Sequence, residues 1–312
     1  MAGKLAFLFP GQGAQAVGMG QELCAKFPIA KQTFEEADDA LGESFSRLIR
    51  EGPKEDLLQT ANTQPAILTM SVAAWRVYRE EGGPAADYVA GHSLGEYSAL
   101  VAGGALEFRD AVRAVRARGT FMQEAVPAGE GAMAAVMGLD AEKIGEVLAG
   151  ISAPEQKSYV AVANYNGPAQ TVIAGHSAGV EAAGPALKSA GAKRVLPLPV
   201  SAPFHCELMR PVQDRLRDVL AEIQMAPIGT PVVTNVEAAA NSDVTQTLDL
   251  LVDQVVAPVR FTEMGQYLIQ QGVSRFVELG PGKTLINILR RMERDAHFAN
   301  VEDEASLREA LA

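Results

Sequence analysis

The sequence predicts an α/β protein in which a smaller unit is inserted into a larger one. Short apolar runs that stop at glycine turns alternate with helical patterns; Lys4–Phe9 stops at Pro10-Gly11, and Tyr88–Ala90 stops at Gly91. From about residue 130 to 198 the predicted order of elements changes to βαββαβ, which is the ferredoxin-like arrangement. We therefore expect two sheets of different design in one chain.

The larger unit is predicted to hold most of the helices. The loop Pro10-Gly11-Gln12-Gly13 can turn backbone N–H groups toward a ligand. A helix is expected to open at Gln64-Pro65, with proline in its first turn. Further helices are expected near 18–27, 96–102, 107–125, 207–223, 248–256 and 262–271, with strands at 232–235 and 276–279. The polar tail after Asp295 is expected to be peripheral and to end in a helix over 304–311.

The inserted unit is predicted from the alternation of strand and helix patterns within one continuous segment. Its strands are expected at 132–137, 158–163, 170–174 and 193–198, and its helices at 140–149 and 178–190. A turn at Asn166-Gly167-Pro168 separates the two central strands.

Composition narrows the class of function. The chain of 312 residues is 48% hydrophobic, has a mean hydropathy of +0.05 and carries a formal charge of −11. Such a charge argues against general affinity for nucleic acid or for anionic membranes. Only Cys24 and Cys206 are present, too few for a disulfide framework or a cysteine metal site, so we expect a reducing compartment, the cytoplasm. No signal peptide or membrane span is visible in the pattern.

The segment Gly91-His92-Ser93-Leu94-Gly95 falls between a predicted strand and a predicted helix. In this Gly-x-Ser-x-Gly pattern a sharp turn lifts the serine oxygen out of the sheet, and the helix N-terminus favours developing negative charge. Gly175-His176-Ser177-Ala178-Gly179 repeats the pattern inside the ferredoxin-like unit. We predict that Ser93 is a nucleophile, because ligand crevices form beyond the carboxyl ends of strands in the larger type of sheet, and that Ser177 is a helix N-cap.

A serine nucleophile needs a neighbouring base, most often histidine. The chain has four histidines: His92 and His176 adjoin their own serines, and His297 lies in the charged tail. His205 remains, expected at the carboxyl end of the apolar strand Val195–Val200. A hydrogen-bonded structural histidine is the alternative, and spacing alone names no partner for the ring, which a backbone carbonyl could orient as well as a carboxylate.

Together these residues resemble a known family. Phe9-Pro10-Gly11-Gln12-Gly13, Gly91–Glu96, Arg118, Pro203-Phe204-His205 and Gln254 are similar to the corresponding motifs of the malonyl-CoA:acyl carrier protein transacylases of dissociated (type II) fatty acid synthesis. The resemblance spans nearly the whole chain. It extends to the acyltransferase domains of polyketide synthases, but the absence of carrier or ketosynthase segments favours the separate enzyme.

The resemblance implies an α/β-hydrolase-like large subdomain, residues 1–128 and 200–312, with the ferredoxin-like insert at 129–199. It implies that Ser93 carries a malonyl ester, that His205 is its base and later its acid, that the Gln254 backbone carbonyl orients His205, and that Arg118 binds the malonyl carboxylate. Malonyl-CoA and acyl carrier protein would be the partners of a monomer that needs no cofactor and no metal.

Physical chemistry favours the same roles. Backbone N–H groups of Leu94 and Gln12 fit the rule that an oxyanion hole combines the residue after the nucleophile with a donor from another loop. A planar arginine fork suits a carboxylate, although Arg118 alone would be interpreted as a surface helix residue. An acidic carrier would need a local basic surface, for which the candidates are Lys188, Lys193, Arg194, Lys283, Arg290 and Arg291.

Two alternatives remain open. A serine hydrolase or thioesterase could use the same residues with water as acceptor, although hydrolases usually place their histidine near the C-terminus. A carrier-docking subunit could keep the fold without catalysis. Phe204 before His205 resembles malonyl-preferring rather than methylmalonyl-preferring acyltransferases, and Cys206 is interpreted as a packing residue.

Overall fold

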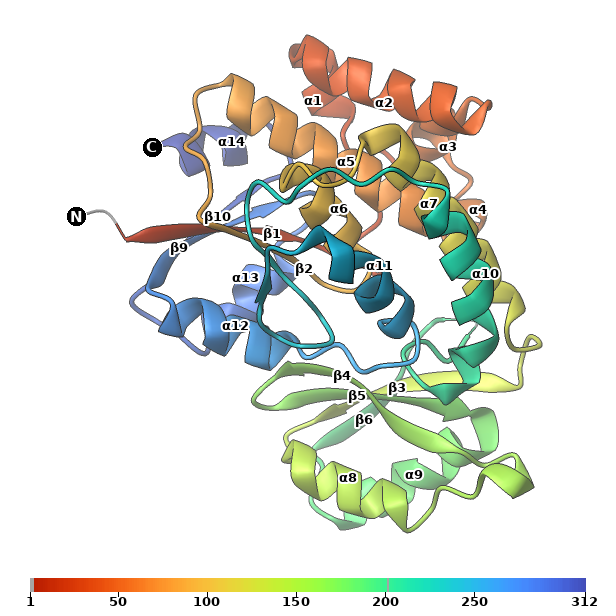
Figure 1. Ribbon diagram of the computed structural model, residues 1–312. Helices are drawn as coiled ribbons and strands as arrows, with labels where there is room; N and C mark the ends of the chain where they lie inside the picture. Colours follow the sequence, from red (N-terminus) through yellow and green to blue (C-terminus); the bar gives the residue numbers. More distant parts are fainter. Residues whose placement is uncertain (1–2, 201) are drawn as a thin grey trace.

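The computed structural model describes residues 3–200 and 202–312, and it contains two separate sheets (Figure 1). Ser201, in the segment that leads to His205, lies outside the described residues. The larger sheet has the strand order β10-β9-β1-β2-β7-β8, parallel throughout except for β8. Its strands are β1 (Lys4–Phe9), β2 (Tyr88–Gly91), β7 (Val232–Val233), β8 (Ala240–Asn241), β9 (Val273–Leu279) and β10 (His297–Val301).

Alternate side chains of β1 enter two apolar clusters, one on each face of this sheet. Leu5, Phe7 and Phe9 join the larger cluster, whereas Ala6 and Leu8 join the smaller one. The helices that contribute to the larger cluster are α1 (Gln21–Lys26), α2 (Pro28–Leu41), α3 (Phe45–Glu51), α4 (Lys54–Leu57), α5 (Thr60–Glu80), α6 (Gly95–Ala102), α7 (Phe108–Glu124), α10 (Arg210–Ala221), α11 (Val244–Asp253) and α14 (Glu304–Leu311). The smaller cluster is covered by α12 (Phe261–Gln270) and α13 (Thr284–Leu289). The central strands are thus buried on both sides, as their apolar sequences require.

The second sheet is antiparallel and comes from one continuous segment. Its strands are β3 (Gly131–Met137), β4 (Val160–Gly167), β5 (Gln170–His176) and β6 (Arg194–Pro197), in the order β4-β5-β3-β6. Helices α8 (Ala141–Ala149) and α9 (Ser177–Ser189) cover one face, and the other face meets the larger unit (Figure 1). This βαββαβ chain order and strand order are ferredoxin-like, so the predicted α/β fold class with a ferredoxin-like insert is confirmed.

Several boundaries differ from the sequence prediction. Helix α5 begins at Thr60, not at Gln64, and Pro65 lies inside it. The proline removes only one backbone donor close to the helix start, and the buried residues on either side of it compensate by packing. The strand predicted to run to Val200 ends at Pro197, so His205 lies in the loop that returns to the larger sheet.

Other elements were not predicted at all. Helices α2, α3, α4 and α13 and strand β10 belong to this group. The tail expected to be peripheral supplies β10, which forms the edge of the larger sheet beside β9, and it ends in α14 as predicted. No helix within the described residues is both long and apolar enough to cross a membrane.

Candidate active site

Ser93 stands on a turn between β2 and α6 that only this arrangement of glycines permits. The serine has φ 53°, in the left-handed region that side chains other than glycine rarely adopt. A β-carbon on Gly91 would lie 2.0 Å from the backbone of Gly95, and one on Gly95 would lie 2.1 Å from the carbonyl oxygen of Phe9. The strand and helix therefore approach so closely that the chain must turn sharply at Ser93, as the Gly-x-Ser-x-Gly pattern predicts.

A buried asparagine stabilises this strained turn. Asn235 follows β7, the neighbour of β2 in the sheet, and its Oδ1 accepts a hydrogen bond of 2.7 Å from the Ser93 backbone N–H. Its Nδ2 donates to the Gly91 carbonyl oxygen, also at 2.7 Å. One amide side chain thus bridges both ends of the turn and offsets the cost of the left-handed serine.

His205 lies against the Ser93 hydroxyl. The distance from Ser93 Oγ to His205 Nε2 is 2.6 Å, and His205 Nδ1 donates to the Gln254 backbone carbonyl at 2.9 Å. A carbonyl only accepts, so the ring proton is on Nδ1 and the lone pair of Nε2 faces the hydroxyl. Burial, and next the positive charge of Arg118, lower the pKa of His205 to about 3, so the ring is neutral and able to accept a proton.

Arg118 brings a buried positive charge to the same hydroxyl. Its side chain, on α7, is 1% exposed, and its Nη2 donates to Ser93 Oγ at 3.1 Å and to Gln254 Oε1 at 2.8 Å. Its Nη1 donates to Gln64 Oε1 at 2.8 Å. These acceptors are all neutral, and burial lowers the pKa of Arg118. A desolvated cation that forms no ion pair with any described carboxylate is suited to an anionic ligand.

Gln12 and Leu94 border the cavity from two different loops. Within residues 3–200 and 202–312, neither of their backbone N–H groups donates a hydrogen bond to another residue. The Gln12 side chain is anchored through Nε2 to Thr60 Oγ1 at 3.3 Å. Two uncommitted donors beside a nucleophile are what an oxyanion hole requires.

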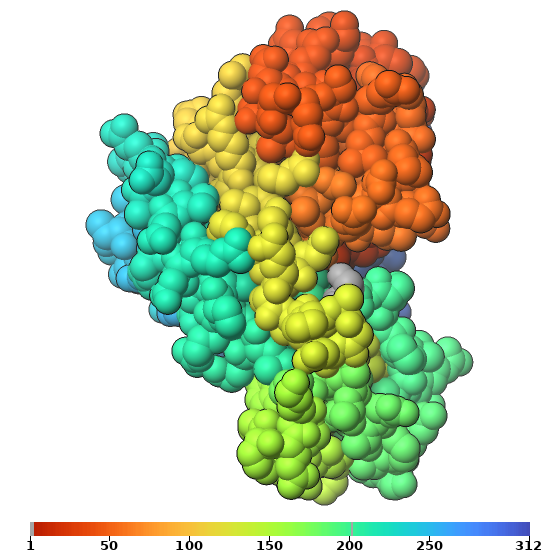
Figure 2. Space-filling model, turned by 90° about the vertical axis from the view of Figure 1, so that its right-hand side faces the viewer, coloured from red at the N-terminus to blue at the C-terminus, as the bar shows by residue number. Residues whose placement is uncertain are grey.

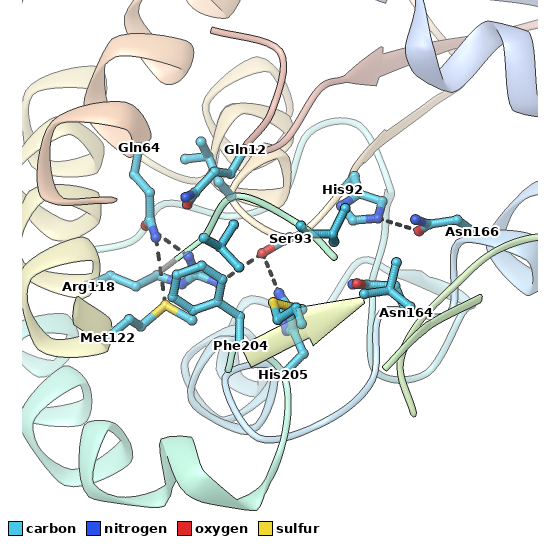
Figure 3. A pocket seen from close by; sticks show the side chains of 15 residues that line it. Gln12, Gln64, His92, Ser93, Arg118, Met122, Asn164, Asn166, Phe204 and His205 are labelled. Carbon is cyan, nitrogen blue, oxygen red and sulfur yellow. Dashed lines mark hydrogen bonds between the residues drawn. The ribbon is translucent and has the colours of Figure 1, made fainter. Parts of the chain in front are cut away.

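The cavity lies between the two units and encloses about 140 Å³ (Figure 3). In Figure 2 the inserted unit, in green, lies below the red and orange N-terminal helices. The cavity's polar end holds Ser93, His205 and Arg118, and its wall is largely apolar. The apolar lining residues are Leu94, Met122, Met133, Val172, Leu198, Val200 and Phe204.

The antiparallel sheet contributes polar groups to the same cavity. His92 points away from His205 and donates through Nε2 to Asn166 Oδ1 of β4 at 2.7 Å (Figure 3). Asn164, also on β4, lies across the cavity from the turn. The site is therefore complete only where the two sheets meet.

The second Gly-His-Ser-x-Gly turn has a different geometry. Ser177 is the first residue of α9, and its hydroxyl donates to the Gly129 carbonyl oxygen at 2.7 Å. The N-cap is His176, which makes no side-chain cap, so the predicted N-cap role of Ser177 is wrong. The hydroxyl reaches back to the loop before β3 instead, because that loop runs alongside the helix start.

Three important contacts were missed by sequence reasoning. Gln64 was assigned only to a helix start and Asn235 only to a strand end, and Glu96 was placed in the family motif and in the helix after the turn without a role. The position of Asn235, a polar residue at the end of a strand in the larger unit, is the one signal that could have identified it. Nothing in the pattern distinguishes Gln64, because its role depends on meeting Arg118 from another helix.

Other candidate groups have no part in this cavity. Among the described residues, no set of three or more His, Cys, Asp or Glu side chains is placed to hold a metal ion. Cys206 is buried, donates to the Pro203 carbonyl oxygen at 3.1 Å and has its thiol pKa raised to about 12 by burial, so the thiol is protonated. His297 is exposed on β10.

Comparison with protein families gives a match over nearly the whole chain. Residues 6–307 match the model of the family described as "Acyl transferase domain". A malonyl CoA-acyl carrier protein transacylase of Bacillus subtilis is 47% identical over 308 residues, which cover 99% of this chain and 96% of that protein. The protein of the same name from Escherichia coli K12 is 46% identical over 308 residues and 99% of each chain.

Solved structures agree with these sequence relatives. An acyl carrier protein S-malonyltransferase from Vibrio cholerae superposes with a TM-score of 0.94 at 46% identity, over 98% of this chain and 99% of that one. A malonyl-transacylase in complex with a type II polyketide synthase acyl carrier protein superposes with a TM-score of 0.95 at 46% identity, over 99% of both chains.

Proposed function

The chain belongs to the acyl transferase domain family, among the malonyl CoA-acyl carrier protein transacylases, and from this premise we propose that it moves a malonyl group from coenzyme A to an acyl carrier protein. The observation that carries the proposal is the contact of Ser93 Oγ with a neutral His205 whose free lone pair faces it. The names of the relatives and the carrier complex of one solved structure support the choice of substrates.

The first half-reaction loads the enzyme. Ser93 Oγ attacks the thioester carbonyl carbon as its proton passes to His205 Nε2, and the oxygen that becomes negative is held by the N–H groups of Gln12 and Leu94. The tetrahedral intermediate collapses, the carbon–sulfur bond breaks, and the departing thiolate takes the proton from His205. The malonyl ester stays on Ser93, and free coenzyme A leaves.

The second half-reaction reverses the roles of the groups. The phosphopantetheine thiol of the carrier gives its proton to His205 Nε2, and its sulfur attacks the ester carbonyl carbon. Ser93 Oγ leaves and recovers the proton from His205, which now acts as the acid. The Gln254 carbonyl keeps the ring in the required tautomer through both steps.

Arg118 would select the substrate. Its buried guanidinium donates to neutral oxygens only, so a malonyl carboxylate would be the first anion in direct contact with it, whereas an acetyl group would offer none. The proposal includes the predicted division into residues 1–128 and 200–312 and residues 129–199, a monomer, no cofactor, and a cytoplasmic location.

The six basic candidates for carrier docking support this proposal by their exposure. Each is exposed, and none forms an ion pair with a described carboxylate, in a chain whose net charge is −11. These residues are Lys188, Lys193, Arg194, Lys283, Arg290 and Arg291. Unpaired cations on an acidic protein are suited to an acidic partner.

Intact-mass measurement after incubation with malonyl-CoA tests the proposal. We expect one malonyl adduct, mapped to the peptide that contains Ser93, which is discharged when carrier protein with its phosphopantetheine arm is added. Rapid release of malonate without transfer would favour a hydrolase. An enzyme that never acquires the adduct would favour a carrier-docking subunit.

A further inference from the structure

Glu96 is a buried carboxylate that the proposed reaction does not use. It is the second residue of α6, it is 2% exposed, and it does not line the cavity. Its Oε2 accepts from the Asn235 backbone N–H at 2.9 Å and from Gln254 Nε2 at 2.8 Å. Burial raises the pKa of Glu96 to about 7, while these donors and the nearby Arg118 oppose the rise. Because burying a carboxyl group is unfavourable, its presence next to the active site indicates a role there.

The side-chain amide of Gln254 lies between this carboxylate and Arg118. Gln254 Nε2 donates to Glu96 and to the Ser93 carbonyl oxygen at 3.1 Å, while Gln254 Oε1 accepts from Arg118 Nη2 at 2.8 Å. The Glu96 oxygen that faces Gln254 is an acceptor, and a guanidinium can only donate. The amide can therefore satisfy both neighbours in one orientation only, and a flipped amide would face Arg118 with its NH₂ group.

The same residue also serves the base. The backbone carbonyl of Gln254 accepts from His205 Nδ1, and the Arg118 nitrogen held by Gln254 Oε1 also donates to Ser93 Oγ. Side chain and backbone of Gln254 thus reach the two groups that act on the nucleophile. Anything that fixes Gln254 fixes the distance between base, cation and hydroxyl.

We propose that Glu96 is a positioning residue for acyl transfer, which locks the Gln254 amide in the orientation that holds Arg118 and His205 around Ser93. This inference rests on the proposed function, because it assigns Glu96 to that reaction. Glu96 touches neither the acyl group nor the reacting atoms. It acts on these atoms through Gln254, and the hydrogen bond from the Asn235 backbone N–H holds the carboxylate in place for that contact.

Two substitutions remove the lock in different ways. Glu96→Gln keeps the size of the side chain, but a second amide can offer either its oxygen or its NH₂ group to Gln254. Glu96→Asp keeps the charge but withdraws it from Gln254. We expect each variant to lower kcat for malonyl transfer by about 10–100-fold, since misplacement of about 1 Å in a catalytic group can cost that much. The ratio of malonyl to acetyl loading should fall as well, and KM for the carrier protein should stay unchanged.

A double-mutant cycle separates positioning from a purely structural role. Gln254→Ala removes the amide but keeps the backbone carbonyl. If Glu96 acts through that amide, adding Glu96→Gln to Gln254→Ala should cause less than about a twofold further loss of kcat, so the two effects are strongly non-additive. Melting temperature, measured in parallel, should not fall for Glu96→Gln, because the substitution removes a buried charge.

Two results of these measurements would overturn the positioning role of Glu96. Additive losses in the cycle, or wild-type kcat and wild-type malonyl-to-acetyl ratio in both Glu96 variants, would reject it while the Ser93 adduct on the wild-type enzyme still supports the proposed function. A wild-type enzyme that forms no adduct would reject both.

Discussion

The two Gly-His-Ser-x-Gly turns of this chain share a sequence pattern and a place between a strand and a helix. In both turns the glycines are needed because backbone atoms pack closely against them. A β-carbon on Gly175 would lie 2.1 Å from the Tyr159 carbonyl oxygen, and one on Gly179 would lie 2.4 Å from the Ser158 carbonyl oxygen, much as in the first turn. The two glycines of the pattern therefore indicate close packing of backbone against backbone. This packing does not distinguish a catalytic turn from a structural one.

The serines and their surroundings differ. Ser93 has a left-handed backbone and faces an imidazole from a distant loop, whereas Ser177 is already helical and donates to a carbonyl. His176 accepts from the Tyr159 backbone N–H through Nδ1, at 3.2 Å, and so has a structural contact of its own. The five-residue pattern alone therefore does not identify a nucleophile, and the proposal for Ser93 rests on its backbone conformation and on the imidazole that faces it.

Replacing each serine by alanine tests directly whether the two turns differ in function. We expect Ser93→Ala to lower malonyl transfer by about 10⁴-fold or more, because the acyl group has no attachment point. Ser177→Ala should change kcat/KM by less than about threefold, since only one exposed hydrogen bond is lost. Steady-state transfer to carrier protein measures both, and an inactive Ser177→Ala enzyme with a normal melting temperature would mean that the second turn is the catalytic one.

Arg118, the buried cation beside the first turn, allows a test of substrate choice that the second turn does not offer. Arg118→Ala should lower malonyl loading by about 10–100-fold, the value expected for a lost hydrogen bond to a charged group, and should lower acetyl loading much less. Loading rates from malonyl-CoA and acetyl-CoA, measured by intact mass, give the ratio. Equal losses with the two donors would show that Arg118 does not bind the carboxylate.

The glycines test whether packing is indeed common to both turns. Gly95→Ala and Gly179→Ala should each lower the free energy of unfolding by about 1–3 kcal/mol, the usual cost of overpacking, since each β-carbon would approach a backbone oxygen. Denaturant unfolding followed by circular dichroism measures the two values. A neutral Gly179→Ala with a destabilising Gly95→Ala would show that close approach matters at the first turn alone.

The smallest effect expected is a pH dependence of stability that arises from the base of the first turn. The pKa of His205 falls from 6.5 in the unfolded chain to about 3 in the folded protein, so between these values the unfolded state binds more protons. His205 therefore contributes stability above pH 6.5 that is lost as the pH falls toward 3. Between pH 7 and pH 5, the melting temperature of His205→Gln should fall less than that of the wild type, and His176→Gln serves as the control. Identical slopes of melting temperature against pH for the wild type and for His205→Gln would contradict the lowered pKa.

The elements that were predicted well have local causes. The βαββαβ unit could be predicted from its sequence because each strand and helix there has its own period. The turn predicted at Asn166-Gly167-Pro168 begins only after Gly167, where β4 ends. Helix α2 begins at Pro28 and ends before Gly42, and α3 ends before Gly52-Pro53, so both carry local boundary signals that the sequence prediction overlooked, whereas α4 has only 4 residues and shows no period. Strand β10 was missed because it directly follows a charged segment that was interpreted as the start of a polar tail, and its edge position is decided by β9.

The two-unit α/β plan and the turn at Ser93 follow from local patterns in the sequence, and elimination among four histidines predicts the residue that faces the serine. The hydrogen bonds that hold Ser93 and Gln254 in place depend on the complete fold. Asn235 and Glu96 meet Ser93 and Gln254 across separations of more than 100 residues, and such contacts leave no periodic trace in a sequence. Local patterns follow from the geometry of one helix or strand, whereas the orientation of a buried amide depends on which donors and acceptors the complete fold places around it.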